Sequence, residues 1–523
     1  MPDLPGGRSR PWPWPVELGL AAGLGALHSL AFVETGFWWL QLLIVATLAW
    51  RVAALAPARA ALAGLVFGTA WFGAGTWWLF VSLHFYGGLA APIAIAAIVL
   101  LSACLALYLA AGLAAFSRWR SGRPARDALF FAAVWLLAEL ARGVFFTGFP
   151  WVASGYAHVD SPLANLAPWV GVYGIGFVGA ALAAWLGLPE RRGRRTWWFA
   201  AVGVGAVLSA AASFGPAQFS QPSGTLAVTL LQGNVSQDEK FSEAHLPAAL
   251  AWTNGQLRAA PGDLVVAPET VIPLLPSQLD PAYWQGLLQH FQSGRQAALI
   301  GLPLGDEVTG YTNSAAGISA ATRALPGGYY RYDKHHLVPF GEFIPWGFRW
   351  FTQLMNIPLG DFNRGPLSEP SFDVTGRSGQ IERIAANICY EDLFGEELAA
   401  RFANAALAPT IFANISNIGW FGDTIAIVQH LQISRMRTLE FERPMLRATN
   451  TGATAVIDHR GGVQFMLKPL TQGVLDGIVQ GRTGLTPFAR WAAAFGLWPL
   501  WGGAAAIVAA AVGFGRPAAR LAT

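Results

Sequence analysis

One cysteine, one glutamate and one lysine stand where side chains can do chemistry. Cys389 follows the apolar run 384–388 and precedes YEDLFGEELAARFA, whose periodicity predicts a helix. A thiol at a strand-to-helix junction is lifted out of the sheet, and the helix N-terminus favours its thiolate, although Glu391 and Asp392 partly oppose this effect. Cys389 is therefore a candidate nucleophile, and a buried structural cysteine is the alternative.

Two further residues are candidate partners of this thiol. Glu269 ends the apolar run LVVAP, so its carboxylate emerges at a predicted strand end, where it can act as a general base; a solvated loop glutamate or a helix cap is the alternative. Lys334 lies in RYDKHHLVPFGEFIP, and the only other lysines are Lys240 and Lys468. A compact ammonium can donate to an oxyanion, whereas the alternative is a surface lysine.

Short apolar runs typical of β-strands must position these side chains. They are separated by helical or loop segments and read TLAVTLLQGN, DLVVAPE, QAALIGLP, RIAANICY, APTIFANIS and TGATAVID. The stretch from about 222 to 480 is therefore predicted to form a mixed α/β domain of ordinary size.

The rest of the chain has the composition of a membrane protein. Of the 523 residues, 54% are hydrophobic and 12% are charged, and the mean hydropathy is +0.41. About eight apolar stretches have the length needed to span a bilayer, at 16–33, 36–56, 60–83, 89–116, 127–146, 166–188, 197–214 and 490–514. The first also fits a signal peptide, but the succession of further spans favours a retained anchor.

Arginine clusters predict the orientation of these spans, because every second connection is basic. The clusters are Arg8 and Arg10; Arg51 and Arg59; Arg118, Arg120, Arg123 and Arg126; Arg191, Arg192, Arg194 and Arg195; and Arg516 and Arg520. The positive-inside rule makes these connections and both termini cytoplasmic, and it puts the loops HFYGG and TGFPWVASGY and the polar domain outside.

The predicted domains are a seven-span membrane domain at 1–218, a catalytic domain at 219–485 and a terminal helix with a short tail at 486–523. Nucleic acid is not expected as a partner.

The cysteine count and the motifs exclude several kinds of site. Two cysteines cannot form a disulfide framework, and Cys104 lies in an apolar run inside the predicted bilayer, out of reach of Cys389. A lone thiol in an oxidising compartment favours a nucleophile. His335 and His336 lack metal-ligand spacing and no nucleotide-binding motif is in context, so neither a metal nor a cofactor is expected.

The segment after Lys334 is unusually apolar for a soluble domain. The residues concerned are Phe340, Phe343, Ile344, Trp346, Phe348, Trp350 and Phe351, with Trp420 and Phe421 further on. An aromatic loop beside a site at the bilayer surface is what an enzyme needs to draw an acyl chain from the membrane. We therefore expect this loop to face the membrane.

The order of the motifs VVAPET, YDKHHLVPFGEFIP and NICYEDLF resembles the nitrilase, or carbon-nitrogen hydrolase, superfamily. With its membrane spans and the block NISNIGWFGDTIAIVQHLQISRMRTLEFERPMLRATNTGATAVI, nearly the whole chain is similar to the apolipoprotein N-acyltransferase family. The resemblance implies an αββα sandwich with Glu269 as general base, Lys334 as oxyanion stabiliser and Cys389 as nucleophile. It also implies accessory roles for Glu342, Tyr390, Glu391, Asn313, Trp151 and Trp420. Phe241 and Ile418 depart from the residues expected at their positions, which leaves lid packing and substrate preference open.

The resemblance also implies an activity and a location. A fatty acyl chain would pass from a phospholipid, phosphatidylethanolamine at sn-1, through a Cys389 thioester to the α-amine of a diacylglyceryl-cysteine on an apolipoprotein. The enzyme would be a monomer of the bacterial inner membrane, with its catalytic domain on the periplasmic side. Two alternatives remain at this point: a membrane-tethered amidase or nitrilase that hydrolyses a small amide, and a non-catalytic scaffold or transporter.

Overall fold

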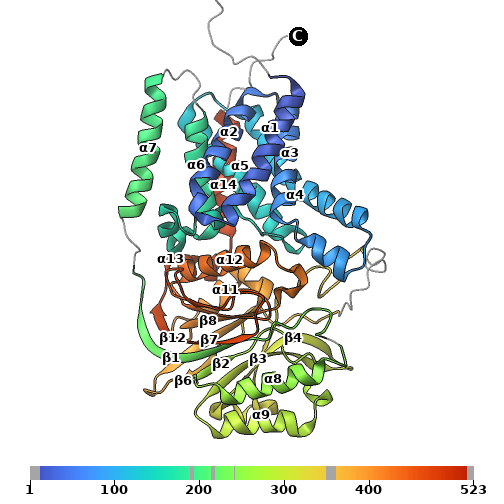
Figure 1. Cartoon of the computed structure of the whole chain (residues 1–523). Helices are drawn as coiled ribbons and strands as arrows, with labels where there is room; N and C mark the ends of the chain where they lie inside the picture. The colour runs from blue at the N-terminus through green and yellow to red at the C-terminus, as the bar shows by residue number, and fades with distance from the viewer. Residues whose placement is uncertain (1–11, 189–193, 214–217, 241, 349–360, 515–523) are drawn as a thin grey trace, which may run out of the picture. The chain divides into compact units, whose positions relative to one another are not determined.

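The computed structural model describes residues 12–188, 194–213, 218–240, 242–348 and 361–514 (Figure 1). The chain divides into two compact units. The first comprises Met1–Trp77, Ile95–Ala217 and Leu497–Thr523, and the second comprises Trp78–Ala94 and Gln218–Gly496. The stretch Trp78–Ala94, which the sequence prediction includes in the membrane domain, therefore belongs to the second unit.

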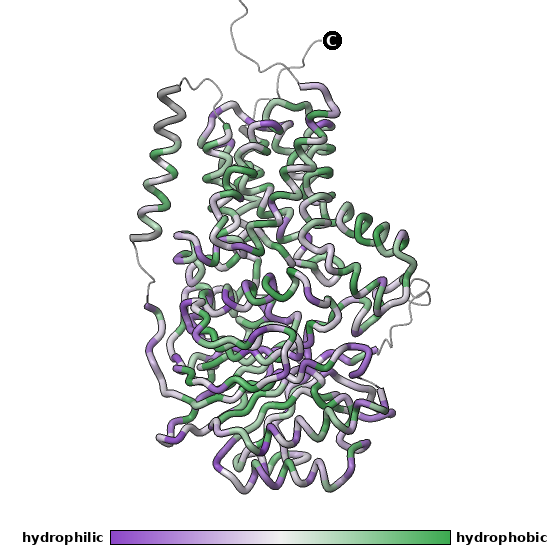
Figure 2. Tube along the Cα trace, viewed as in Figure 1, coloured by the Kyte–Doolittle hydropathy of each residue, from purple (hydrophilic) through white to green (hydrophobic). Residues whose placement is uncertain are grey.

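The first unit is built from apolar α-helices, which Figure 2 colours mainly green. They are α1 (Trp14–His28), α2 (Trp38–Ala54), α3 (Pro57–Gly75), most of α4 (Ala91–Trp119), α5 (Pro124–Val144), α6 (Ala167–Gly187), α7 (Arg194–Ser213) and α14 (Trp498–Phe514). Among the described residues, five helical segments are long and apolar enough to cross a membrane, or up to six if one bent pair of helices forms a single span. The five are Trp14–Phe32, Thr35–Ala54, Ala91–Trp119, Pro124–Thr147 and Pro162–Gly187. The chain is a membrane protein.

Two of the eight predicted spans differ from continuous helices. The run 60–83 is helical in α3 only as far as Gly75, because Thr76 leaves the helical region with φ −130° and ends the helix. The run 490–514 is split into α13 (Pro487–Phe495) and α14, because Gly496 adopts a positive φ of 55° that ends the first helix.

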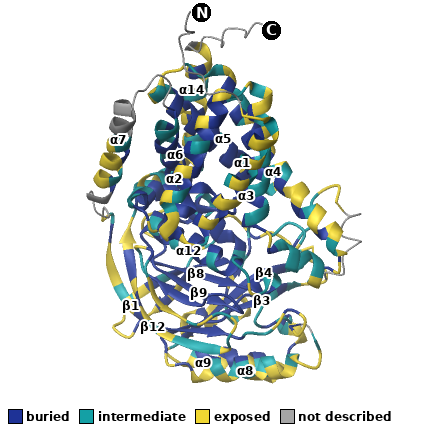
Figure 3. Cartoon of the chain, turned by 45° about the horizontal axis from the view of Figure 1, so that its top comes forward, coloured by how far each residue is buried: buried dark blue, intermediate teal, exposed yellow. Residues whose placement is uncertain are grey.

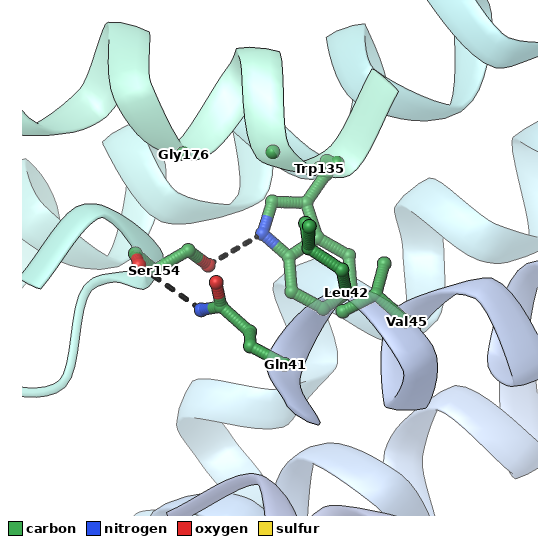
Figure 4. Close-up of a pocket in the computed structure, with 8 residues that line it drawn as sticks. Gln41, Leu42, Val45, Trp135, Ser154 and Gly176 are labelled. Atoms are coloured by element: carbon green, nitrogen blue, oxygen red, sulfur yellow. Dashed lines mark hydrogen bonds between the residues drawn. The ribbon is translucent and has the colours of Figure 1, made fainter. Parts of the chain in front are cut away.

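A buried polar cluster lies inside the first unit, around Ser154 (Figure 4). The backbone carbonyl of Ser154 accepts a hydrogen bond from Gln41 Nε2 at 3.0 Å, and its Oγ accepts one from Trp135 Nε1 at 2.8 Å. Glu139 Oε1 accepts hydrogen bonds from Ser154 N at 2.7 Å and Ser154 Oγ at 2.9 Å. Arg142 donates to the carbonyls of Phe149 and Trp151 at 2.7 and 2.9 Å. The cluster therefore holds the non-helical segment that follows α5.

The second unit contains two six-stranded sheets. The first has the order β12-β1-β2-β3-β4-β5 and the second the order β11-β10-β9-β8-β7-β6. The strands are β1 (Ser220–Gln232), β2 (Leu264–Val266), β3 (Ala297–Asp306), β4 (Gly310–Ile318), β5 (Tyr330–Asp333), β6 (Phe372–Thr375), β7 (Ile381–Ile388), β8 (Ile411–Ser416), β9 (Met445–Thr449), β10 (Ala455–Ile457), β11 (Val463–Met466) and β12 (Gly473–Gly484). The central strands β1, β2 and β3 run parallel, as do β7, β8 and β9.

Alternation of side chains along the strands builds two hydrophobic cores. Leu264 and Val266 of β2 point into the core shared by both sheets, whereas Val265 points into the core beneath α8 (Leu246–Ala259) and α9 (Pro281–Ser293). On the second sheet, α12 (Ala426–Phe441) packs against β9. The strands β8 and β9 are entirely buried, whereas parts of β1 and β12 are exposed (Figure 3). The combination of apolar helices with a two-sheet α/β domain agrees with the prediction.

The stretch Trp78–Ala94 joins the second unit through aromatic contacts. Trp78 Nε1 donates to Gln429 Oε1 at 3.0 Å, and the Trp78 ring lies 4.3 Å from that of Phe421. Tyr86, in the π-helical turn Val81–Tyr86, packs edge to face on Trp420 with 5.7 Å between the ring centroids. These contacts explain why a piece of the predicted membrane domain groups with the α/β unit.

Candidate active site

Glu269 and Lys334 both follow strands of the first sheet. Glu269 lies three residues beyond the end of β2, at 7% exposure, and Lys334 directly follows β5, at 1% exposure. Asn313 on β4 lies between them in the sheet order, since β4 pairs with both β3 and β5. Neither charged residue is a solvated surface residue, which excludes the surface alternatives for Glu269 and Lys334.

These three side chains and that of Glu342 form one hydrogen-bonded group. Lys334 Nζ lies 3.4 Å from Glu269 Oε1 and 2.9 Å from Glu342 Oε1. Asn313 Nδ2 donates to the same two oxygens at 2.7 and 2.6 Å. The other oxygen of each carboxylate accepts a backbone N–H: Glu269 Oε2 from Asn417 at 2.8 Å and Glu342 Oε2 from Val338 at 2.8 Å. Every carboxylate oxygen is therefore held, so the group is rigid.

Cys389 follows β7 and adopts a left-handed backbone conformation, with φ 54°. Such a conformation costs a non-glycine residue about 1–3 kcal/mol and persists only where its surroundings enforce it. The residue is half-buried and packs against the core between the sheets. Its position after a strand agrees with the prediction, but the helix expected after it is broken into the 3₁₀ turn Cys389–Leu393, the short α11 (Gly395–Ala399) and a further turn.

Glu391 connects the loop of Lys334 to the strand of Cys389. Its Oε1 accepts hydrogen bonds from the backbone N–H groups of His335 at 2.7 Å and His336 at 3.2 Å. Its Oε2 accepts from Tyr332 Oη at 2.8 Å and from the backbone N–H of Ile388 at 2.6 Å. One buried carboxylate thus fixes the residue after Lys334 and the residue before Cys389.

Electrostatics set the protonation states of the site. Burial raises the pKa of the Cys389 thiol, and Glu269 raises it further, while Lys334 opposes the rise. Burial works against an ionised Glu269, yet Lys334 and Lys240 together lower its pKa. Burial likewise works against a charged Lys334, but Glu342 and Glu269 raise its pKa. The resting site therefore holds a neutral thiol beside an ionised carboxylate and an ammonium, and the expected helix-stabilised thiolate does not dominate.

The sequence interpretation missed two residues of this group. Lys240 is 7% exposed, and its Nζ donates to the backbone carbonyl of Glu269 at 3.1 Å. Burial lowers the pKa of Lys240 to about 8, against the charges of Glu269 and Cys389. Asn417, whose N–H binds Glu269, also donates from Nδ2 to Gln237 at 3.0 Å. The scarcity of lysine in the chain points to Lys240 as much as to Lys334, and is the signal that could have found it.

The remaining predicted positions fall in different places. Tyr390 is buried, with its ring 5.3 Å from Phe394. Trp420 is half-buried against Tyr86. Trp151 lies in the first unit, 3% exposed. Of the two departures, Ile418 is buried in the 3₁₀ turn after Asn417, and Phe241 lies outside the described residues.

The aromatic segment after Lys334 is exposed in part. Trp346 is 99% exposed and Phe348 45% exposed, and the Phe340 ring packs edge to face on Phe348 at 5.4 Å. Trp350 and Phe351, predicted in the same segment, lie outside the described residues. Large exposed aromatic side chains on a domain of a membrane protein are typical of an interfacial surface.

Family models match both parts of the chain. Residues 225–488 match the carbon-nitrogen hydrolase model, and residues 24–185 match the model of the apolipoprotein N-acyltransferase N-terminal domain. The two-sheet unit with its Glu, Lys and Cys group is thus a carbon-nitrogen hydrolase domain in a membrane protein.

Relatives along nearly the whole length specify the family further. The chain is 53% identical over 511 residues to the apolipoprotein N-acyltransferase of Verminephrobacter eiseniae, covering 92% of this chain and 94% of that protein. It is 47% identical over 476 residues to that of Ralstonia nicotianae, covering 90% and 89%. The chain belongs to the apolipoprotein N-acyltransferase family.

Proposed function

We propose that the chain moves a fatty acyl chain from a phospholipid, through a thioester on Cys389, to the α-amine of the diacylglyceryl-cysteine of an apolipoprotein. The observation that carries this proposal is the electrostatic interaction of Cys389, which has a strained backbone, with the buried Glu269 carboxylate and the buried Lys334 ammonium. Family membership supports the acyltransferase class.

In the first half-reaction, the sulfur of Cys389 attacks the ester carbonyl of the donor and Glu269 takes the thiol proton. The pKa of the thiol is raised and that of Glu269 lowered, so proton transfer before attack would be uphill. The proton therefore leaves as the carbon–sulfur bond forms. Lys334 donates to the developing oxyanion, and collapse of the tetrahedral intermediate releases a lysophospholipid, whose freed oxygen takes from Glu269 the proton that came from the thiol, so that Glu269 is ionised again.

In the second half-reaction, the neutral amine of the acceptor attacks the thioester carbonyl. The amine proton passes to Glu269 and the thiolate leaves, so that an amide forms and the Cys389 thiol is regenerated with that proton. Glu342 and Asn313 hold Lys334 and Glu269 in place throughout, and Glu391 fixes the backbone on either side. The scheme consumes no cofactor.

The proposal includes substrate and membrane details. The donor is phosphatidylethanolamine, attacked at sn-1, and the enzyme acts as a monomer. Trp151, Trp420 and Tyr390 are accessory residues. The exposed aromatic side chains Trp346 and Phe348 support contact of this domain with a lipid surface.

We further propose that the enzyme lies in the bacterial inner membrane, with the catalytic domain at 219–485 on the periplasmic side. The alternation of arginine-rich connections supports this orientation and two cytoplasmic termini. We propose eight spans, seven in the domain at 1–218 and one at 486–523. This number requires α3 and α7 to cross the bilayer in addition to the five long apolar segments and the bent pair of helices. Cysteine labelling from each side of inverted vesicles tests the orientation.

Mass spectrometry of the intact protein tests the acyl-enzyme directly. The full-length chain in nanodiscs of phosphatidylethanolamine should gain one acyl group, which hydroxylamine removes as expected for a thioester. Cys389→Ala should gain none, whereas Cys104→Ala, the matched removal of the other cysteine, should behave as the unaltered protein. Transfer of acyl chains by Cys389→Ala would refute the proposal.

A diacylglyceryl peptide with a free amine tests the acceptor. Its addition should clear the adduct and yield the N-acylated peptide, while an N-acetylated peptide should leave the adduct in place. Release of free fatty acid without any acylated peptide would instead indicate a hydrolase.

A further inference from the structure

The backbone carbonyl of Cys389 is held by two buried side chains from the second sheet and its covering helix. Asn414 on β8 donates to it from Nδ2 at 3.1 Å, and His430 on α12 approaches it with Nε2 at 3.2 Å. Asn414 and His430 are 0% and 1% exposed. Two buried side chains thus hold the backbone carbonyl of Cys389, the residue with the left-handed conformation.

The surroundings of His430 determine which ring nitrogen carries its proton. Arg447 approaches His430 Nδ1 with NH2 at 2.8 Å. Because a guanidinium only donates, Nδ1 must accept, so the proton of the neutral ring lies on Nε2. From Nε2 this proton is directed to the Cys389 carbonyl and to Asp392 Oδ1, which lies 3.0 Å away.

A closed polar ring keeps His430 in this state. Asp392 Oδ2 lies 3.5 Å from Arg447 NH1 and accepts from Ser434 Oγ at 2.5 Å. Asp392, Ser434 and Arg447 are all 0% exposed, and Arg447 also donates to Ser434. Burial and Arg447 lower the pKa of His430. The ring therefore keeps a neutral imidazole as a hydrogen-bond donor.

We propose that His430 is a positioning residue that fixes the nucleophile by donating its Nε2 proton to the backbone carbonyl of Cys389. This inference rests on the proposed function, in which Cys389 is the nucleophile. With the carbonyl held, the backbone stays left-handed and the thiol stays beside Glu269 and Lys334. Without the donor, the residue relaxes toward an ordinary conformation and the sulfur loses its alignment.

Two amide substitutions of His430 form a matched test. The amide of glutamine reaches the place of Nε2, whereas the shorter asparagine reaches only the place of Nδ1. Both are neutral and polar. Glutamine keeps the donor to the Cys389 carbonyl and Asp392 but loses the acceptor for Arg447, and asparagine does the reverse. Full-length His430→Gln and His430→Asn proteins in phosphatidylethanolamine nanodiscs are compared for the single-turnover rate of acyl adduct formation at saturating lipid. His430→Leu removes both hydrogen-bonding nitrogens of the ring. His290→Gln, at a half-exposed position of α9, is the control.

We expect His430→Asn to form the adduct about tenfold more slowly than the unaltered protein, as for loss of one buried hydrogen bond. His430→Gln should stay within about threefold of it, and the lipid concentration for half-maximal rate should not change in either. Equal rates for Asn and Gln variants with matching melting temperatures would overturn the inference. If His430→Leu does not fold, the Asn and Gln pair decides alone.

A second readout separates this inference from the proposed function. Alkylation of Cys389 by N-methylmaleimide, measured in a Cys104→Ala background, should slow in His430→Asn and not in His430→Gln. If the unaltered protein forms no acyl adduct, the proposed function fails while the alkylation rates still test the positioning role. If it does form the adduct and both rates are insensitive to His430→Asn, only the positioning role fails.

Discussion

The two units each bury a cation with a carboxylate, and only one of these clusters is arranged for chemistry. In the first unit, Arg142 and Glu139 direct their hydrogen bonds to the backbone and to Ser154, so their polarity is used in holding a non-helical segment. In the second unit, Lys334 is shared by Glu269 and Glu342, and both Lys334 and Glu269 interact electrostatically with Cys389, whose backbone is strained. A buried ion pair is therefore weak evidence for a site, and the destination of its hydrogen bonds is better evidence.

Replacing the carboxylate of each cluster should give the largest difference in reaction rate between the two units. Glu269→Gln removes the proton acceptor, and we expect acyl-enzyme formation per folded molecule to slow by about 10²–10⁴-fold, beside a loss of stability from the weakened pair with Lys334. Glu139→Gln should leave the rate per folded molecule within a few-fold, because it only weakens the hold on Ser154. Single-turnover mass spectrometry, with melting curves on the same samples, compares the pair. A loss of rate in Glu139→Gln as large as in Glu269→Gln would break the distinction.

Replacing the cation of each cluster should likewise lower the rate in the second unit and mainly the stability in the first. Lys334→Met removes the donor to the oxyanion, and we expect about 10²–10³-fold slower adduct formation. Arg142→Met breaks the buried pair of the first unit and should cost about 3 kcal/mol of stability while lowering the rate per folded molecule by less than tenfold. Rates are normalised to the folded fraction measured by thermal unfolding. A folded Lys334→Met protein with an unchanged rate would remove Lys334 from the chemistry.

Lys240 tests whether the second cluster needs an additional positive charge. Its pKa of about 8 means that the charge is lost above that pH, so we expect adduct formation to fall several-fold between about pH 7 and 9. Lys240→Met should show the low rate at every pH and no step near pH 8. Rate profiles of the two proteins over pH 6–10 make the measurement. Persistence of the step in Lys240→Met would assign it to another group.

Stability should respond to Lys240 in the opposite direction. The folded protein releases this proton at about pH 8, whereas the ordinary value in the unfolded chain is 10.5. Between these values the unfolded chain binds more protons, so this residue makes stability rise with pH there and penalises the fold below pH 8. Lys240→Met should therefore raise the melting temperature at pH 7, and a lower value would contradict the assignment of burial as the main cause.

The smallest effect should come from Ser154 of the first cluster. Ser154→Ala removes a hydroxyl that accepts from Trp135 and donates to Glu139, which should cost about 1–2 kcal/mol without changing the rate. Chemical denaturation in detergent measures the cost. A change in adduct formation larger than the change in folded fraction would show that this segment takes part in the reaction.

Local pattern alone was enough for the outline of the molecule. Six of the twelve strands follow apolar runs that the sequence displays, because a strand buried on both faces needs consecutive apolar residues. β4 escaped prediction, since GYTNSAAGI is small and polar and takes its place only by pairing with β3 and β5. Apolar length likewise predicted membrane helices, but not the break at Gly496, which depends on a backbone conformation.

Residue type and strand-end position were sufficient to nominate Glu269, Lys334 and Cys389, because side chains that follow a strand are free to leave the sheet. Glu269 and Lys334 follow strands of the first sheet, and Cys389 follows β7 of the second. Only the tertiary structure decided how they are paired and charged. Lys240 comes from a separate segment to contact Glu269, and the carbonyl of Cys389 meets His430 from α12. Burial and neighbouring charges set protonation states, and both depend on which distant segments pack together, which no local pattern encodes.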